Sequence, residues 1–262
     1  MQEQEQEIEA QRRLMKPTDT AGLAEIAEST ARFVATLTTL TDDRIGGPTL
    51  VPPWTRGHVI THVARATDSL CRLLTWARTG VETPQYASME ARVAEIEAGA
   101  ARPVAALIAD ITDTADRFEE AVRSLPEAAW RTEVRMRTGE LRTPASLVPT
   151  RLRELEVHHA DLAVGYTFAD VPSAAARWII DDLVEALHRR DDLPALRFAA
   201  TDTPLSHELA PGGPLITGPP VRPPGLAHRT LTRHGPDGVR RRRGAPGALL
   251  DLTTTGPDRN WT

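Results

Sequence analysis

The chain has 262 residues, of which 26% are charged, and a formal net charge of −5. This length suggests one large domain or two small ones, with enough chain to bury a core, and the negative charge argues against nucleic-acid binding as the main task. The basic run at residues 240–243 is interpreted as a solvated loop or strand rim. The single cysteine, Cys71, excludes an internal disulfide and a cysteine-rich zinc site. No apolar run approaches 18 residues and the N-terminus is charged, so we expect a soluble cytoplasmic protein with no membrane partner.

The first part of the chain predicts helices. Residues 1–17 are rich in Gln and Glu and predict a disordered tail. Apolar residues then recur with a helical period from residue 18 to about residue 40, before a Gly- and Pro-rich segment. A second helix is predicted to start after the N-cap residue Thr55 and to end at Gly80.

The middle of the chain continues the helical pattern. Residues 87–124 predict one long helix or two broken ones, with Pro103 near the first turn of the second piece. Residues 126–143 predict an irregular loop or a short hairpin. A fourth bundle helix is predicted to open at Pro144 and to run to about Gly165.

The last part of the chain differs in composition. A further helix is predicted after Pro172 and reaches Arg190, and residues 191–262 contain many prolines, glycines and short apolar runs. We therefore predict a mainly α protein, with a helical bundle at residues 18–170 and a small α/β domain at residues 171–262.

Two pairs of polar residues are spaced four apart, which places each pair on one face of a helix. His58 and His62 form the first pair, and Glu154 and His158 form the second, with Asp161 continuing the same stripe. Such a stripe either faces water or faces the bundle interior and holds a ligand. In bundles, inward-facing His and carboxylate side chains from separate helices commonly bind divalent metals, and these ligand types suit Zn²⁺, Fe²⁺, Ni²⁺ or Mn²⁺.

Two segments together resemble the mycothiol-dependent maleylpyruvate isomerase family of the DinB-like superfamily: VPPWTRGHVITHVARATDSLCRLLTWARTG and RLRELEVHHADLAVGY. The resemblance implies a DinB-like four-helix bundle followed by an α/β domain, a divalent metal that is usually zinc, and mycothiol as a thiol cosubstrate. Carried over to this chain, the metal ligands are His62, Glu154 and His158. His58 competes with His62 for the first place, and we prefer His62 because it lies one turn deeper in the helix.

The chain departs from the family near its C-terminus. Relatives finish with a Leu-Leu-x-Trp-Leu-x-Gly-Arg-like segment, whereas this chain reads LLDLTTTGPDRNWT, so a substrate-binding arginine cannot be placed. The resemblance then leaves three functions open: an isomerase of a maleylpyruvate-type diacid, a thiol S-transferase with the same site, and a non-catalytic binding or regulatory protein. The expected partners are a small-molecule thiol and an electrophilic substrate, and the expected assembly is a monomer or homodimer.

Further residues are candidates for supporting roles. Asp161 and either Arg151 or Arg153 are placed around the metal ligands, with Asp161 and Arg153 chosen as catalytic candidates, although a solvated ion-pair pattern explains these residues equally well. Trp54 and Arg56 are candidates for binding the thiol cosubstrate, with packing and capping as the more ordinary explanation. Cys71 lies in an apolar helical stretch, where a buried structural thiol is expected, so the reactive thiol would come from outside the chain.

Overall fold

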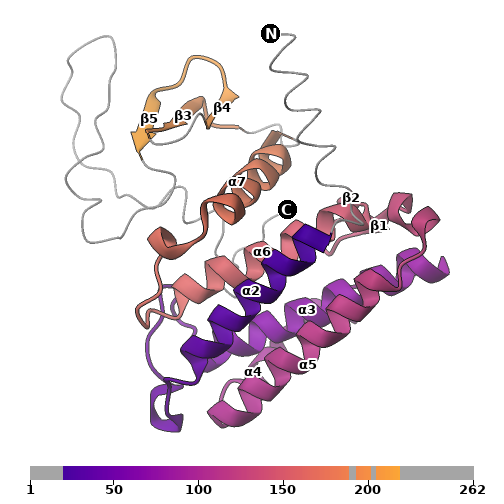
Figure 1. Ribbon diagram of the computed structural model, residues 1–262, viewed down its shortest axis with the longest axis vertical. Coiled ribbons are helices and arrows are strands. Elements are labelled where there is room, and N and C mark those ends of the chain that lie inside the picture. The colour runs from indigo at the N-terminus through magenta and orange to yellow at the C-terminus, as the bar shows by residue number, and fades with distance from the viewer. Residues whose placement is uncertain (1–19, 189–192, 202–204, 219–262) are drawn as a thin grey trace. The chain divides into compact units, whose positions relative to one another are not determined.

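The computed structural model describes residues 20–188, 193–201 and 205–218 (Figure 1). The contacts divide the chain into two units, and among the described residues the first ends at Val164 and the second begins at Gly165. The predicted tail at residues 1–17, the basic run at residues 240–243 and the divergent C-terminal segment lie outside the described residues.

The first unit is built around four long helices and one shorter helix (Figure 1). Helix α3 packs against α5 and α6, and α2 packs against the same two helices, while the shorter α4 packs against α3. The side chains buried between them are apolar and include Phe33, Leu73, Ile111, Phe118, Leu147 and Leu155. The helices are α2 (Thr20–Leu37), α3 (Arg56–Thr79), α4 (Met89–Gly99), α5 (Val104–Arg123) and α6 (Pro144–Asp161).

Helix α3 has the boundaries that its sequence predicts. The Thr55 N–H donates to His58 Nδ1 at 3.2 Å, and the Thr55 hydroxyl lies 2.7 Å from the same nitrogen. These contacts stabilise the first turn as a capping box does. The helix ends at Gly80, whose φ of 71° is the left-handed conformation that glycine adopts without strain. Both ring nitrogens of His58 therefore have partners at the start of the helix, since Nδ1 contacts Thr55 and Nε2 lies 3.1 Å from Glu97 Oε2.

Helices α3 and α4 approach each other closely at two glycines. A Cβ atom at Gly57 would lie 1.8 Å from the carbonyl oxygen of Ala100, and one at Gly99 would lie 2.3 Å from Thr61 Cγ2. Any larger residue at either place would force the helices apart. The contact holds α4 beside the N-terminal half of α3, and it brings Arg92 of α4 close to His62.

Helix α6 follows a short hairpin. The sequence predicted either an irregular loop or a short hairpin for residues 126–143, and the structure has the hairpin. The short helix η2 (Glu127–Arg131) leads into strands β1 (Val134–Arg135) and β2 (Leu141–Arg142), which pair antiparallel. Pro144 occupies the start of α6, where its missing N–H is of no consequence. The helix ends at Asp161, one turn before the predicted end at Gly165.

The described part of the second unit contains one α-helix and a small sheet. Helix α7 (Ser173–His188) follows the 3₁₀ helix η3 (Phe168–Asp170) and packs against β4. The sheet has the order β4-β3-β5, in which β4 (Ser206–Ala210) is antiparallel and β5 (Leu215–Gly218) is parallel to β3 (Leu196–Ala200). The mainly helical fold with a small α/β module is therefore confirmed.

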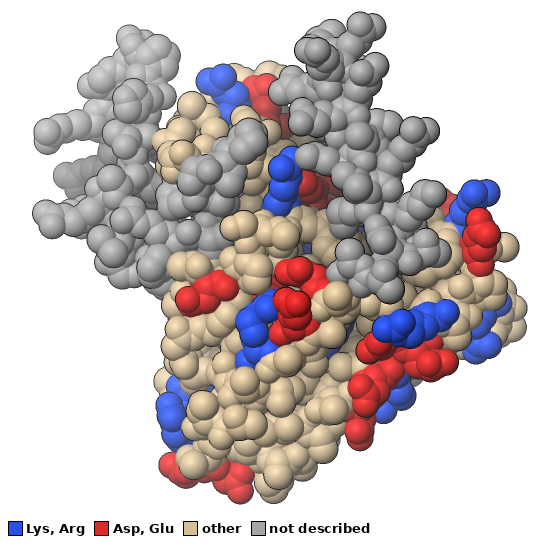
Figure 2. Space-filling view, viewed as in Figure 1, with Lys and Arg blue, Asp and Glu red and all other residues tan. Residues whose placement is uncertain are grey.

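The surface carries charges of both signs. On the face seen in Figure 2, basic and acidic side chains lie interspersed over the bundle. Ion pairs also join α3 and α5, such as Arg117 with Asp68 at 2.7 Å. Within the described segments, no helix combines the length and the apolar character that a membrane crossing requires.

Candidate metal centre

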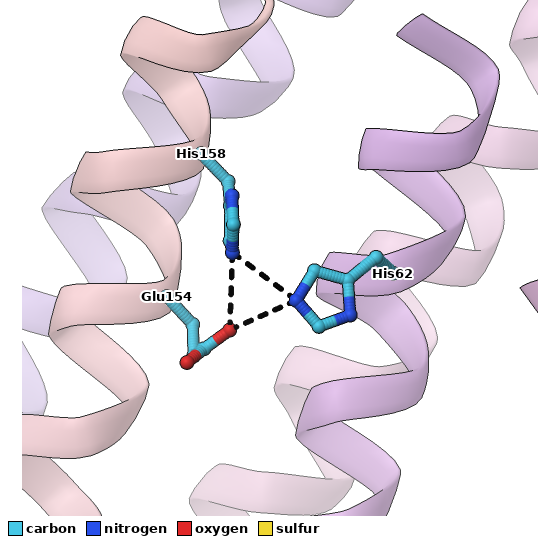
Figure 3. Close-up of side chains that lie close together, drawn as sticks. All are labelled: His62, Glu154 and His158. Atoms are coloured by element: carbon cyan, nitrogen blue, oxygen red, sulfur yellow. Dashed lines mark hydrogen bonds and ion pairs between the residues drawn. The ribbon is translucent and has the colours of Figure 1, made fainter. Parts of the chain in front are cut away.

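Two histidines and one glutamate meet between α3 and α6 (Figure 3). The Nε2 atoms of His62 and His158 are 3.1 Å apart. Glu154 Oε2 lies 3.3 Å from His62 Nε2 and 3.4 Å from His158 Nε2. The three ligand atoms therefore form a nearly equilateral triangle, with one residue from α3 and two from α6.

The triangle has the dimensions of one face of a tetrahedral coordination shell. Two ligand atoms at about 2.1 Å from a tetrahedral ion are about 3.4 Å apart, close to all three distances here. Glu154 Oε2 is also buried and forms no hydrogen bond of good geometry, although both imidazole nitrogens lie within 3.4 Å of it. A buried carboxylate needs strong compensating interactions, and a cation bound in the triangle would supply one. The residues present therefore fit a divalent metal bound by two nitrogens and one oxygen.

The local sequence explains why these side chains converge. Glu154 and His158 are one helical turn apart, so α6 projects both toward the same neighbour. That neighbour is α3, which packs against α6 and presents His62 from its second turn. His62 and His158 are 3% and 2% exposed, so their imidazoles are almost completely shielded from bulk water.

His158 is oriented by Asp161 on the next turn of α6. Its Nδ1 lies 2.8 Å from Asp161 Oδ2, and Asp161 is itself only 2% exposed. Burial disfavours the protonated imidazole, but the contacts with Asp161 and Glu154 outweigh burial and raise the pKa of His158 to about 9. A carboxylate behind a ligating histidine is the common arrangement in metal sites, because it leaves Nε2 directed at the ion.

Glu154 and His62 respond differently to the same surroundings. Burial disfavours ionised Glu154, yet His158 and His62 outweigh burial and hold the pKa of this carboxyl well below its usual range. Burial is also the main reason that the pKa of His62 falls to about 4, and the positive charges of His158 and Arg92 add to the decrease. Near neutral pH the carboxylate is therefore ionised and the His62 ring is neutral.

The other predicted site residues, Trp54, Arg56 and Arg153, lie around the two helices that carry the triangle. Trp54 is buried, with its ring centre 5.1 Å from that of His62. Arg56 donates from Nε to the Leu162 carbonyl and from Nη1 to the Arg44 carbonyl, both at 3.0 Å. These are packing and positioning contacts. Arg153 is half-buried on α6, about 100° around the helix from Glu154, and its catalytic assignment stays a prediction.

The sequence patterns did not point to three residues around the triangle, which are Tyr86, Arg92 and Arg137. Arg92 Nη2 lies 3.3 Å from His62 Nδ1, and its guanidinium carbon is 5.9 Å from the Trp54 ring centre and 5.7 Å from that of Tyr86. Arg137, on the β1–β2 turn, donates its main-chain N–H to Gln85 Oε1 at 2.6 Å, and Gln85 precedes Tyr86. No local motif marks these residues, because loops and helices distant in sequence bring them to the site.

Arg151 was one of two alternatives, and the structure distinguishes it from Arg153. It lies three residues before Glu154, so it continues the stripe of Glu154 and His158 on α6. Its side chain is 0% exposed, and none of its guanidinium nitrogens has a hydrogen-bond partner. Burial is the main reason that its pKa falls to about 10.

Cys71 is half-buried rather than fully buried, and it faces a groove between α3 and α5. Burial, assisted by the charge of Asp68, raises the pKa of its thiol to about 11. The side chain is therefore a neutral thiol near neutral pH, and a neutral thiol is a poor nucleophile. This agrees with the expectation that Cys71 is structural.

Comparison with known proteins places these observations in a family. The family model for the mycothiol maleylpyruvate isomerase N-terminal domain matches residues 26–163, which is more than half of the chain and includes all three residues of the triangle. None of the curated proteins compared with the chain matches it.

Two solved structures resemble about three quarters of the chain. The crystal structure of a mycothiol-dependent maleylpyruvate isomerase is 29% identical, with a TM-score of 0.70, over 76% of this chain and 84% of that one. The structure of a variant of such an isomerase, in which one histidine is replaced by alanine, is 28% identical with the same TM-score and coverage. Both similar structures are those of an enzyme. The chain therefore belongs to the family defined by the mycothiol maleylpyruvate isomerase N-terminal domain.

Proposed function

We propose that the chain is a metal-dependent enzyme that uses mycothiol to attack an electrophilic carbon of a small molecule. The observation that carries this proposal is the triangle of His62, Glu154 and His158, whose three ligand atoms lie within 3.4 Å of one another. Membership of the family and the similarity to solved mycothiol-dependent isomerases support the choice of thiol.

Each residue of the site has a distinct task in this proposal. His62, Glu154 and His158 hold the ion, for which zinc is our choice, and Asp161 keeps His158 in the orientation that directs Nε2 to it. A divalent ion held by three protein ligands would have room for a thiol and would favour its ionised form. Trp54 packs against His62, and Arg56 ties the start of α3 to two carbonyls. We retain both as candidates for contact with the thiol.

The favoured reaction is cis–trans isomerisation of a conjugated acid. The thiolate adds to one carbon of the double bond, and the electron pair moves onto the conjugated carbonyl oxygen. Rotation about the new single bond follows, and loss of the same thiolate restores the double bond. The thiol is regenerated, so no atom is gained or lost. An external thiol is needed because Cys71 is a neutral, half-buried thiol.

Thiol transfer is the second candidate, because the C-terminal sequence departs from the family pattern and a substrate-binding arginine cannot be placed there. In that reaction the sulfur stays attached to the substrate carbon. Mass spectrometry of the metal-loaded protein with mycothiol and a maleylpyruvate-type acid distinguishes the two. A product with the substrate's mass supports isomerisation, and a stable adduct supports transfer. No reaction above that of the His62→Ala variant would contradict both and favour a binding protein.

A further inference from the structure

Arg92 is a buried cation beside the metal triangle that has no carboxylate partner. Its side chain is 4% exposed, and among the described residues no Asp or Glu forms an ion pair with it. Its Nη2 lies 3.3 Å from His62 Nδ1, its side chain also interacts with the Tyr86 hydroxyl, and its guanidinium faces the rings of Trp54 and Tyr86. The rings attract a cation through their faces, but they do not neutralise its charge.

The contact between Arg92 and His62 cannot be a hydrogen bond when His62 holds a metal. The Nε2 atom of His62 points into the triangle, so a neutral ring bound through Nε2 carries its proton on Nδ1 (Figure 3). Arg92 has only N–H groups to offer, and a donor would then face a donor. His158 differs, because its Nδ1 faces the carboxylate of Asp161. Metal binding therefore removes His62 as an acceptor for Arg92, whose several N–H groups can then serve another acceptor.

Two further arginines around Glu154 also lack carboxylate partners. Arg151 is fully buried without hydrogen bonds, and Arg137 forms no ion pair within the described part of the chain. Elsewhere the arginines of the bundle commonly pair, as Arg32 does with Glu156 at 2.7 Å and Arg102 with Asp110 at 2.7 Å. With a divalent ion bound, the positive charges around Glu154 would exceed the negative ones, and an anionic ligand would redress this imbalance.

We propose that Arg92 binds a carboxylate group of the electrophilic substrate. A guanidinium between two aromatic rings can form charge-assisted hydrogen bonds to a planar carboxylate, which supplies both the acceptor and the missing negative charge. The acceptor would lie on the far side of the His62 ring from the triangle's centre, so it belongs to a part of the substrate other than the reacting atoms. The assignment of this carboxylate to the electrophilic substrate rests on the proposed function, whereas the binding of a carboxylate by Arg92 does not.

The test uses metal-loaded protein and an unreactive probe. Isothermal titration calorimetry compares succinate with its neutral diamide, succinamide, on the wild type and on Arg92→Gln, Arg92→Lys and Arg135→Gln. Arg135 is an exposed arginine on β1 and serves as the matched control. We expect succinate to bind the wild type and Arg135→Gln equally, and Arg92→Gln about 10- to 100-fold more weakly. Arg92→Lys should retain part of the affinity, and Arg92→Gln should retain its metal.

Equal succinate binding by wild type and Arg92→Gln would show that the carboxylate binds the metal alone, and would overturn the proposal. Wild-type protein that does not prefer succinate to succinamide would overturn it as well. In turnover assays, Arg92→Gln should raise KM for the electrophile and leave KM for mycothiol unchanged, whereas the reverse would contradict the assignment to the electrophile. Arg92-dependent succinate binding by protein that shows no thiol chemistry would refute the proposed function and leave this site standing.

Discussion

His158 Nδ1 and Asp161 Oδ2 are 2.8 Å apart, and both side chains are buried on one face of α6. The two residues are separated by three positions, so a single helix supplies both the metal-facing histidine and the carboxylate that orients it. The α3 ligand, His62, directs its Nδ1 toward Arg92 Nη2, at 3.3 Å. The two histidines are therefore inequivalent, and Asp161 supports only one of them.

Replacing Asp161 with Asn should weaken metal binding while preserving the triangle. Asn can still accept a hydrogen bond from His158, but it lacks the charge that increases the basicity of the ring. We expect an affinity loss of about 10- to 100-fold, measured by competition with a chromogenic chelator. Asp113→Asn, at an exposed position of α5, should leave the affinity unchanged. Equal affinities for the two variants would show that Asp161 does not support the site.

Metal binding should release about one proton per ion at neutral pH. In the metal-free protein the pKa of His158 is about 9 and that of His62 is about 4. At pH 7 only His158 is protonated, and it must lose this proton to bind an ion. The affinity should therefore rise with pH up to about 9, by about tenfold per unit near neutrality, and fall on acidification. Calorimetry in buffers of different ionisation enthalpy measures the proton release. A value near zero would contradict this account of His158.

Cys71 should be dispensable for catalysis and slow to react. Its thiol has a pKa of about 11, so only a small fraction is ionised at pH 8. Iodoacetamide should label it much more slowly than it labels a free thiol such as N-acetylcysteine, and the rate should increase from pH 8 to pH 10. Cys71→Ser should retain at least about half of the wild-type activity with mycothiol, because nothing in the triangle contacts the thiol. Complete loss of activity in a folded Cys71→Ser protein would make Cys71 a participant in the reaction.

Much of the bundle could be predicted because its signals are local. Thr55 and Gly80 mark the ends of α3 through capping chemistry that needs no distant partner. The end of α6 was predicted one turn too late, because apolar residues continue past Asp161 without a cap residue that marks the boundary. The alternation in residues 126–143 suited a loop or a hairpin equally, and only the pairing of Val134 with Arg142 distinguishes them.

The metal triangle was only partly visible in the sequence. Helical spacing pairs Glu154 with His158, but it cannot show which residue of another helix completes the set, and the choice of His62 over His58 came from depth in the helix and the family resemblance. Arg92 lies in a charged helix, MEARVAEIEAG, that reads as a solvated surface. It is buried only because α4 approaches α3 at Gly57 and Gly99, and such contacts are tertiary.

We predict that His62, Glu154 and His158 hold one divalent ion, and His58 provides the matched comparison. Both histidines lie on α3 one turn apart, but His58 caps the helix while His62 faces the triangle. Elemental analysis of the purified wild type, His62→Ala and His58→Ala measures ions per chain. We predict about one ion for the wild type and for His58→Ala, with the latter melting about 2–4 °C lower, and less than about one-tenth of an ion for His62→Ala. Metal retained in full by His62→Ala, or lost in His58→Ala, would contradict the assignment.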